Sequence, residues 1–369
     1  MGTLVIGAGQ AGLAAGYHLR RRGLPFVMVD EHERVGDVWR KRWDSLRLFT
    51  PGRYNRLPGM AFPGPPSTYP TKDEVANYLE TYAREFALPV RTGIRVERLS
   101  AVDGRFEAVC GDEMLSAENV VVATGAYHHP RVPAFAADLD TTIVQLHSSE
   151  YRNATQLRDG SVLIVGAGNS GAEIAMELAG HHQVWLSGPD TGQEPTSAGT
   201  LPDRLFTPIM WLMATRLTVK NPIGRKLRDH FLFPPRGIPL GRIRRKDILA
   251  AGIKRVGRTT GVRDGYPVLE DGRVLRVSNV IWCTGYRQDF SWVDPPLPNH
   301  HGFPTHDRGI LHSVPGLYVV GLPFLYSLSS ALLGGVGRDA EHIVDHLASR
   351  RALPDSMGSP AEAGVQASR

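Results

Sequence analysis

The fold of this chain is decided near its N-terminus by the stretch Leu4-Val-Ile-Gly7-Ala-Gly9-Gln-Ala-Gly12. Residues 4–6 form a short apolar run that predicts a buried strand, and the glycines form a turn that opens a helix over residues 13–22. A second apolar strand is expected at residues 26–29 and ends at Asp30. The order of strand, glycine turn, helix and strand is typical of a βαβ unit that binds a dinucleotide.

The three glycines and the acid have separate roles in such a unit. Gly7 allows the tight turn out of the strand, Gly9 removes the Cβ that would block a pyrophosphate, and Gly12 lets the helix pack close to the sheet. The helix N-terminus adds free N–H groups and positive potential for the phosphates. Asp30 lies 23 residues after Gly7, where a carboxylate can accept both hydroxyls of an adenosine ribose.

The same motif occurs again in the middle of the chain. A strand at residues 161–165 leads into the turn Gly166-Ala-Gly168-Asn-Ser-Gly171, a helix at 172–179 and a strand at 183–186. This second strand is followed by Ser187, without an acid. Because a carboxylate there would repel the 2′-phosphate of NADPH, its absence favours NADPH over NADH. Two such units predict two bound dinucleotides; the alternative is an old duplication in which one site was lost.

The remaining patterns predict an α/β fold with two Rossmann-like dinucleotide-binding domains. Thr71 and Glu74 form a capping box that starts a helix running to about residue 86. Strands of a small connecting sheet are expected at residues 94–96 and 106–109. Continuous apolar runs that end in glycine, as a covered parallel sheet requires, stand at residues 120–124, 280–284 and 317–320.

Composition excludes several classes of protein. The 369 residues exceed the usual size of one core, so two domains are expected. Two distant cysteines exclude a disulfide scaffold, and without a CxxC pair a flavin–disulfide reductase has no dithiol. We expect a cytoplasmic protein with no signal peptide, no transmembrane segment and no bound metal, because no suitable apolar run or His/Cys cluster occurs.

Positive charge is concentrated in one segment. Residues 201–260 hold fourteen Lys and Arg against three Asp, whereas the whole chain has a net charge of only +5. A solvated helical face explains such a segment, and so does attraction to an anionic cofactor or a peripheral membrane contact. No nucleic-acid-binding motif is present, so we expect no nucleic-acid partner.

Three further motifs carry a family resemblance. Residues 123–133, ATGAYHHPRVP, fit the pattern ATGxxxxPxxP, and residues 147–151, HSSEY, fit the second half of FxGxxxHxxxY. Residues 35–40, VGDVWR, are similar to a GGxW stretch that lies near a flavin. Over roughly residues 3–350 the chain resembles class B flavoprotein monooxygenases, the group of flavin-containing monooxygenases and Baeyer–Villiger enzymes, and within it the bacterial CzcO-like oxidoreductases.

The chain also departs from the family pattern. Thr141 and Ile143 stand where the fingerprint has an aromatic residue and a glycine, and Phe49 stands where many relatives carry an asparagine beside the flavin. Pro189 stands where an arginine for the 2′-phosphate is expected. The first two departures favour an alternative reaction in which no substrate is oxygenated.

The resemblance implies an architecture. Residues 1–155 and 276–350 would form a discontinuous FAD-binding domain, and residues 156–275 an inserted NADPH-binding domain with a basic helical insert at about 200–250. Residues 351–369 are small and polar, which predicts a disordered tail.

The resemblance also implies a reaction. NADPH would reduce FAD, and reduced FAD would combine with O₂ to a C4a-(hydro)peroxyflavin that inserts one oxygen atom into a small organic substrate at N, at S or at a ketone. The alternatives are an NADPH-dependent flavin oxidase or reductase that produces H₂O₂, and a nucleotide-binding sensor without catalysis. The oligomeric state stays open, a homodimer included.

These inferences together name the expected site. His147 is the one catalytic candidate, at the junction of the two domains. The expected cofactor-binding residues are Gly7, Gly9, Gln10, Ala11, Gly12, Asp30, Trp39, Arg40, Val96, Thr124, Gly125, Gly166, Gly168, Asn169, Ser170, Gly171, Ser187, Gly285 and Gly337. Gly337 belongs to a glycine-rich segment whose N–H groups would face the pyrimidine side of the flavin.

Overall fold

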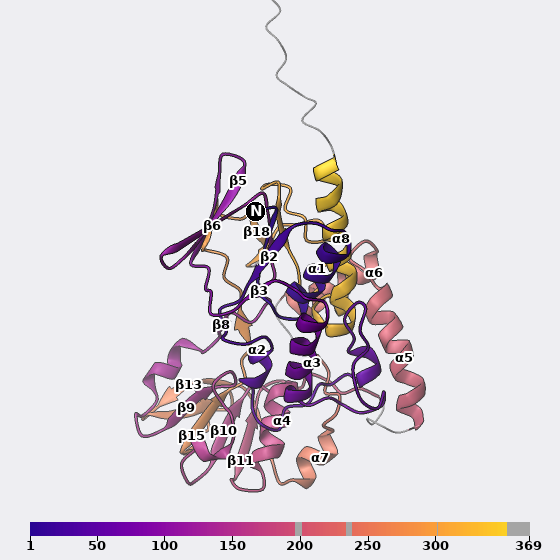
Figure 1. Cartoon of the computed structure of the whole chain (residues 1–369). Helices are drawn as coiled ribbons and strands as arrows, with labels where there is room; N and C mark the ends of the chain where they lie inside the picture. The colour runs from indigo at the N-terminus through magenta and orange to yellow at the C-terminus, as the bar shows by residue number, and fades with distance from the viewer. Residues whose placement is uncertain (196–200, 234–237, 301, 353–369) are drawn as a thin grey trace, which may run out of the picture.

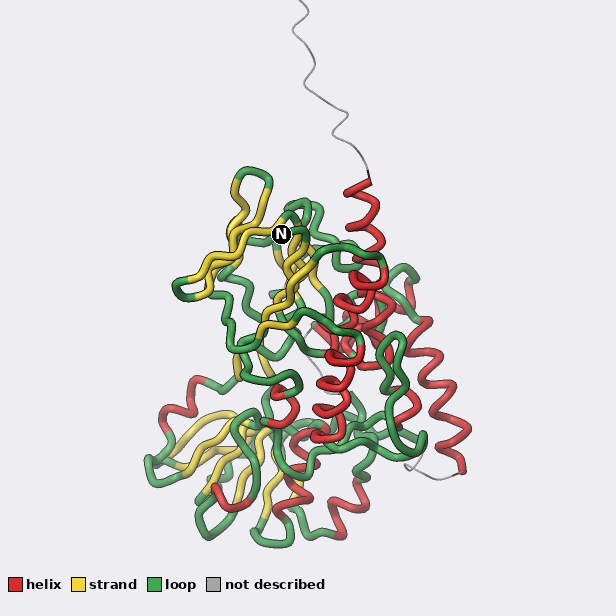
Figure 2. The backbone as a smooth tube through the Cα atoms, in the orientation of Figure 1, coloured by secondary structure: helices red, strands yellow, loops and turns green. Residues whose placement is uncertain are grey.

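A computed structural model describes residues 1–195, 201–233, 238–300 and 302–352. Figure 2 shows its strands in two groups, one above the other, with the longer helices gathered along one side. The predicted disordered tail falls almost wholly on residues 353–369, which lie outside the described residues.

The first group of strands is a parallel sheet with the order β20-β7-β1-β2-β3. Its central strand β1 pairs in parallel with a neighbour on each side, and its four residues are all buried. Helix α1 leaves β1 at the glycine turn and packs along the C-terminal helix α8 (Figure 1). These elements span β1 Thr3–Ile6, α1 Gln10–Arg21, β2 Phe26–Val29, β3 Val90–Arg91, β7 Asn119–Val122, β20 Leu317–Val319 and α8 Leu333–Ala352.

The second group is also a parallel sheet, with the order β12-β11-β10-β15-β9. Strand β10 leads through the second glycine turn into α4, as β1 leads into α1. In Figure 1 this sheet lies below the first. Its elements are β9 Val144–His147, β10 Val162–Val165, α4 Asn169–Leu178, β11 Val184–Ser187, α7 Arg245–Ala250, β12 Lys254–Val256 and β15 Asn279–Trp282. The prediction of two Rossmann-like units in an α/β fold is confirmed.

Two short strands join the sheets. Strand β8, His129–Pro130, pairs antiparallel with β16, Tyr286–Arg287, so the chain passes between the sheets twice at one place. The sequence placed β9 and β15 with the FAD-binding domain, but β15 pairs with β10, and β9 pairs with β15. Both strands therefore belong to the second sheet.

Smaller sheets complete the fold. The expected strand at residues 106–109 is confirmed as part of β5, whereas the strand expected at 94–96 is wrong. That segment is irregular, and it lies beside the end of β2, where the Ile94 N–H donates to the Asp30 carbonyl at 2.9 Å. The smaller strands are β4 Arg98–Val102, β5 Arg105–Cys110, β6 Glu113–Ala117 and β17 Val293–Asp294 in one sheet, the hairpin β13 Thr259–Arg263 with β14 Tyr266–Leu269, and the pair β18 Asn299–His300 with β19 Phe303–Pro304.

The capping box at Thr71 is confirmed at the start of α3, Lys72–Glu85. The Glu74 N–H donates to Thr71 Oγ1 at 3.2 Å, and the Thr71 N–H donates back to the Glu74 carboxylate at 2.7 Å. The short helical turns are α2 Asp37–Arg40, η1 Gly52–Tyr54, η2 Ala134–Asp138, η3 Ala154–Gln156 and η4 Leu328–Ala331.

The basic segment, residues 201–260, begins with two helices, α5 Leu201–Arg216 and α6 Pro222–Leu232, and continues through α7 and β12. Although α5 follows the second glycine unit in sequence, it packs on the N-terminal part of the chain: Trp211 stacks on Tyr54 at 4.9 Å between ring centroids. Among the described residues, no helix is both long enough and apolar enough to span a bilayer.

Candidate functional site

The first glycine turn has the sterics that a pyrophosphate site requires. A Cβ on Gly7, whose φ is +104°, would lie 2.6 Å from the Ala123 carbonyl oxygen, and a Cβ on Gly12 would lie 1.8 Å from the Gly7 carbonyl oxygen. A Cβ on Gly9 would meet no atom within 4 Å. Gly7 and Gly12 therefore hold strand, turn and helix together, while Gly9 leaves open space in front of the N-terminus of α1.

No side chain caps α1, whose N-cap is Gly9 and whose first turn carries no acid. The free N–H groups at this end of the helix are consequently available to an anion, and the helix dipole favours one there.

The turn opens into a cavity of about 810 Å³ at the carboxyl ends of the first sheet's strands. Such crevices are where open α/β sheets bind ligands. Eight of the predicted cofactor-binding residues line this cavity: Gly7, Gly9, Gln10, Ala11, Asp30, Val96, Thr124 and Gly125. The residues fit an extended dinucleotide such as FAD, because the cavity, the open glycine and the uncapped helix coincide.

Asp30 lies at the end of β2 and takes part in the turn. Its carboxylate accepts the Ala8 N–H at 2.6 Å and the His32 N–H at 2.9 Å, and it lies 2.9 Å from His32 Nδ1. Burial alone would raise the pKa of Asp30, but the hydrogen bonds from His32 and Ala8 lower it. The carboxylate is thus held ionised beside the cavity, as an acceptor for ribose hydroxyls needs to be.

Trp39 and Arg40 do not line the cavity. The Arg40 guanidinium bonds instead to the Val35 carbonyl at 2.7 Å and to Glu80 on α3 at 2.8 Å. Arg42, two residues further on, does line the cavity and donates to the Tyr286 hydroxyl at 2.6 Å. Lys41 lines the cavity as well, so of these three consecutive basic residues only Arg40, the one predicted, does not line it.

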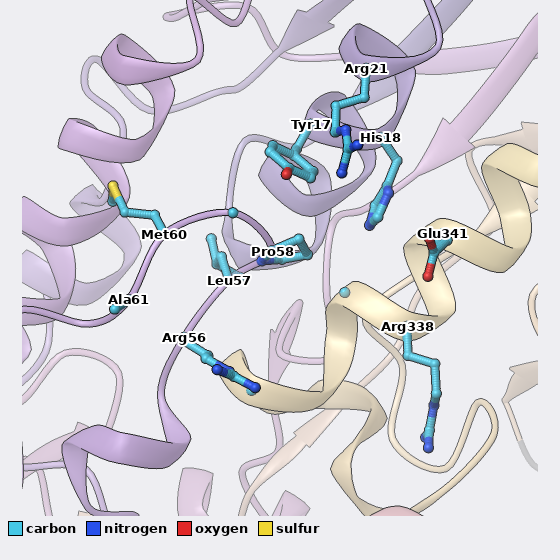
Figure 3. A pocket seen from close by; sticks show the side chains of 13 residues that line it. Tyr17, His18, Arg21, Arg56, Leu57, Pro58, Met60, Ala61, Arg338 and Glu341 are labelled. Atoms are coloured by element: carbon cyan, nitrogen blue, oxygen red, sulfur yellow. The ribbon is translucent and has the colours of Figure 1, made fainter. Parts of the chain in front are cut away.

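Gly337 lines a different cavity, of about 570 Å³, between α1, residues 56–61 and α8 (Figure 3). A Cβ on Gly337 would lie 2.4 Å from Pro58 Cγ, so this glycine lets the loop approach the helix. Tyr17, His18 and Arg21 of α1 line the same cavity from the other side. It shares none of the residues of the first glycine turn, and we assign the cofactor site to the larger cavity.

His147 lies at the junction of the two sheets. Its Nε2 is 3.1 Å from the Gly285 carbonyl oxygen, its Nδ1 is 2.8 Å from Ser149 Oγ, and its ring meets that of Tyr286 edge to face at 4.9 Å. Only 2% of the residue is exposed, and burial lowers its pKa. A neutral histidine with both ring nitrogens engaged fixes the junction, and it does not line the large cavity.

The second glycine turn repeats the sterics of the first. A Cβ on Gly166, at φ +112°, would lie 2.2 Å from the Cys283 carbonyl oxygen, and one on Gly171 would lie 1.9 Å from the Gly166 carbonyl oxygen. Gly168 again has no atom within 4 Å of its Cβ position, and it is the uncapped N-cap of α4. Ser170 is exposed in the first turn of that helix.

Two other predicted residues of the second unit have their side chains engaged. The Asn169 amide bonds to the carbonyl of Pro239 at 3.2 Å, and it accepts the Gly241 N–H at 3.2 Å. The hydroxyl of Ser187, which is fully buried, donates to the Gly257 carbonyl at 2.8 Å. Asn169 therefore ties the turn to a distant loop, and Ser187 ties β11 to the segment after β12.

The structure adds two arginines that sequence reasoning missed. Arg255 on β12 donates to the Gly188 carbonyl at 3.0 Å, directly after β11, and Arg245 on α7 pairs with Asp190. Because these residues are more than fifty positions from the second glycine turn in sequence, only the pairing of β11 with β12 and the placement of α7 reveal them. Arg255 is a cation that the sequence of β11 and the residues directly after it lack, while Arg245 balances the charge of Asp190.

The described residues contain no group of three or more His, Cys, Asp or Glu side chains arranged to hold a metal ion. The two cysteines, Cys110 and Cys283, are free thiols. Burial raises the pKa of Cys283 to about 12, so this thiol stays protonated.

Comparison with known proteins is consistent with this geometry. Residues 4–201 match the pyridine nucleotide-disulphide oxidoreductase family. The chain is 41% identical over 346 residues to a CzcO-like oxidoreductase of Geobacillus kaustophilus, which covers 94% of this chain and 97% of that one. It is 30% identical to a probable indole-3-pyruvate monooxygenase, YUCCA7, of Arabidopsis thaliana, over 79% of this chain and 76% of that one.

Among solved structures, a variant of the flavin monooxygenase from Stenotrophomonas maltophilia superimposes with a TM-score of 0.78 at 28% identity, over 95% of this chain and 99% of that one. The predicted fold class, the resemblance and the prediction of a redox enzyme are confirmed. The chain belongs to the pyridine nucleotide-disulphide oxidoreductase family and, within it, to the CzcO-like oxidoreductases.

Proposed function

We propose that this oxidoreductase is a FAD-containing, NADPH-dependent monooxygenase that inserts one atom of O₂ into a small organic substrate at nitrogen, at sulfur or at a ketone. The cofactor pair agrees with the pyridine nucleotide named by the family and with the flavin named by the similar structures. The substrate class follows from the type of reaction that the resemblance implies.

One observation carries the proposal. The chain has two glycine turns of the same sterics, each at the uncapped N-terminus of a helix and each in its own parallel sheet. Two dinucleotides are what such a pair accommodates: one for FAD at the large cavity and one for NADPH at the second turn. A sensor without catalysis that binds one nucleotide would leave the second open glycine without a ligand.

The protein's own part in the reaction is to bind and orient. Residues of the first turn hold the FAD pyrophosphate, Asp30 its ribose, and Val96, Thr124 and Gly125 the walls around it. When bound, FAD takes a hydride from NADPH and, with O₂, supplies the oxygen that is transferred. Gly168 and Ser170 hold the NADPH pyrophosphate.

Two further groups complete this assignment. Arg255 of β12, at the end of β11, is the cation that would meet a 2′-phosphate, while Arg245 is engaged by Asp190. His147 and Gly285 fix the junction through which the two cofactors meet, so His147 is a positioning residue rather than a catalytic one. We place the boundaries between the two domains at β8 and β16. The NADPH-binding domain then lies between these strands in sequence, and the FAD-binding domain comprises the chain before β8 and after β16.

The test is a balance of reductant against product. The purified protein, checked for bound flavin by its visible absorbance, is incubated with NADPH, O₂ and panels of amines, sulfides and ketones. We expect NADPH consumption to be matched by an oxygenated product, identified by a mass increase of one oxygen atom. If every panel gives H₂O₂ equal to the NADPH consumed, the chain is an oxidase; if no flavin is bound, both assignments fail.

A further inference from the structure

Helices α5 and α6 expose several large apolar side chains. Ile209, Leu212 and Met213 of α5 are 56%, 53% and 45% exposed, and Ile223 at the start of α6 is 66% exposed. The first three are spaced at i, i+3 and i+4, which places them on one face of a helix. With Met210, they are five of the fourteen large hydrophobic residues exposed on the described part of the chain, all within fifteen positions.

The inner surface of α5, and the turn that follows it, are already occupied. Trp211 stacks on Tyr54, the Thr215 carbonyl accepts the Arg338 guanidinium at 2.7 Å, and the Val219 N–H donates to the Tyr326 carbonyl at 2.8 Å. In Figure 1, α5 and α6 lie along the edge of the molecule, outside α8. The exposed apolar face is therefore the one that points to solvent in the folded protein, and a different docking of the insert would have to break these contacts.

Cations border this apolar face. Arg216 closes α5, Lys220 lies in the turn, and Arg225 and Lys226 lie on α6; all four are exposed. No ion pair with an acid of the described residues involves any of them, and the one acid of α6, Asp229, pairs with Arg228. We call the apolar residues 209, 210, 212, 213 and 223, together with these four cations, the insert surface.

We propose that the insert surface docks the protein onto a lipid bilayer with anionic headgroups. Exposed aliphatic and methionine side chains flanked by unpaired Lys and Arg are the features of an interfacial helix, which buries its apolar face in the headgroup region and draws anionic lipid to its cations. A nucleic acid would attract the same cations but would gain nothing from an apolar centre.

A second copy of the chain is the less favourable occupant. In a two-fold dimer formed through this surface the patch would face itself, so the four cations of each copy would meet those of the other. An anionic bilayer would bury the apolar side chains and attract the cations at the same time, without that repulsion.

The test uses the full-length protein with its bound flavin. Sedimentation is measured with vesicles of phosphatidylcholine alone, and with vesicles of two parts phosphatidylcholine to one part phosphatidylglycerol. We expect binding to the anionic vesicles, at least about tenfold weaker binding to the neutral ones, and weakening but not full loss at high salt. The proposal would be overturned if the protein bound neither type of vesicle, or if it bound both types equally well.

Variants separate the two features of the surface. Leu212→Glu with Met213→Glu, and Lys220→Glu with Lys226→Glu, should each lower the vesicle partition coefficient by about tenfold or more. Leu249→Glu is the matched control for the first pair, because Leu249 is 77% exposed on α7, outside the insert surface. Arg263→Glu on β13 is the matched control for the second, and both controls should bind as the unchanged protein does.

Thermal unfolding and flavin absorbance show whether each variant is folded. If a double variant fails to fold, its two substitutions are made singly, since exposed single substitutions are usually tolerated. Light scattering after gel filtration decides on the second copy: a dimer that the Leu212→Glu, Met213→Glu variant converts to a monomer, with vesicle binding unchanged, would contradict the bilayer assignment.

Discussion

The two glycine turns of this chain agree in backbone and differ at the ends of the strands that follow them. In both, the first glycine has a φ above +100°, the last glycine is almost in contact with the first, and the middle glycine faces open space. Both middle glycines are helix N-caps without a side-chain cap. The two turns therefore have the same geometry where a pyrophosphate would bind.

The difference lies at the position expected to meet a ribose. The first unit places Asp30 there, with its carboxylate bonded to the Ala8 N–H. The second places Ser187 there, with its hydroxyl bonded to the Gly257 carbonyl, and Arg255 of β12 donates to the carbonyl of the neighbouring Gly188. The two turns thus share the sterics of a pyrophosphate site, and they differ in the charge at the end of the following strand.

The largest effect is expected from Gly9→Val. The side chain would fill the open space in front of α1 and exclude the pyrophosphate, while the fold has room for it, since no atom lies within 4 Å of the Cβ position. We expect a folded protein without bound flavin, measured as visible absorbance after gel filtration. A yellow Gly9→Val protein with full flavin content would show that the first turn is not the FAD site.

The second prediction moves the same change to the other turn. Gly168→Val should leave FAD bound and lower the rate of flavin reduction by NADPH at least about a hundredfold, because it blocks only the second pyrophosphate site. The measurement is anaerobic stopped-flow absorbance after mixing with NADPH.

Dithionite provides the control for Gly168→Val, since it reduces the flavin without a nicotinamide site and should bleach the variant normally. If NADPH reduces the variant at the rate of the unchanged protein, the second turn is a relic, and the two turns are alike in geometry but not in use.

The sequence could predict both turns because their logic is local. Glycine at positions 7, 9 and 12, a preceding apolar run and a following helix are all contained in about twenty residues. The same holds for the capping box at Thr71, whose two hydrogen bonds join residues three apart. Seven of the ten strands in the two parallel sheets were predicted in the same way, because they are continuous apolar runs. The edge strands β3, β9 and β12 were not predicted, since they are only partly buried.

What could not be predicted depends on contacts between distant segments. Arg255 reaches Gly188 across a strand pair, and Arg42 reaches Tyr286 across the junction of the two sheets. The position of β9 and β15 in the second sheet follows from pairing partners more than one hundred residues apart. Likewise, Gly337 was expected to bind the flavin because of the family resemblance, but its close packing against Pro58 is a structural reason for a glycine at this position.

The acid of the first unit allows a smaller, graded test of the comparison. Asp30→Ala removes a carboxylate that is ionised beside the cavity, and losing hydrogen bonds to a charged group typically costs about 1.5–3 kcal/mol. FAD affinity, measured by titrating flavin-free protein, should fall by about ten- to a hundredfold. Glu33→Ala, an exposed acid three positions further on, is the matched control and should bind FAD as before. Unchanged affinity in Asp30→Ala would remove Asp30 from the FAD site.

The smallest expected effect, and the sharpest test of how the two turns differ, is that of Arg255→Ala. Arg255 is partly exposed and donates to the Gly188 carbonyl, while Asp190 beside it is neutralised by Arg245, so the charge of Arg255 is left for a 2′-phosphate. We expect kcat/KM for flavin reduction by NADPH to fall by about tenfold, at the lower end for a charged hydrogen bond because solvent screens the site. The value for NADH, which has a hydroxyl at that place, should hardly change. Arg263→Ala, which removes an exposed arginine from the neighbouring β13, should change neither. An equal fall with both nucleotides would mean that Arg255 only holds the segment after β11, and that the second unit distinguishes NADPH from NADH through the missing acid alone.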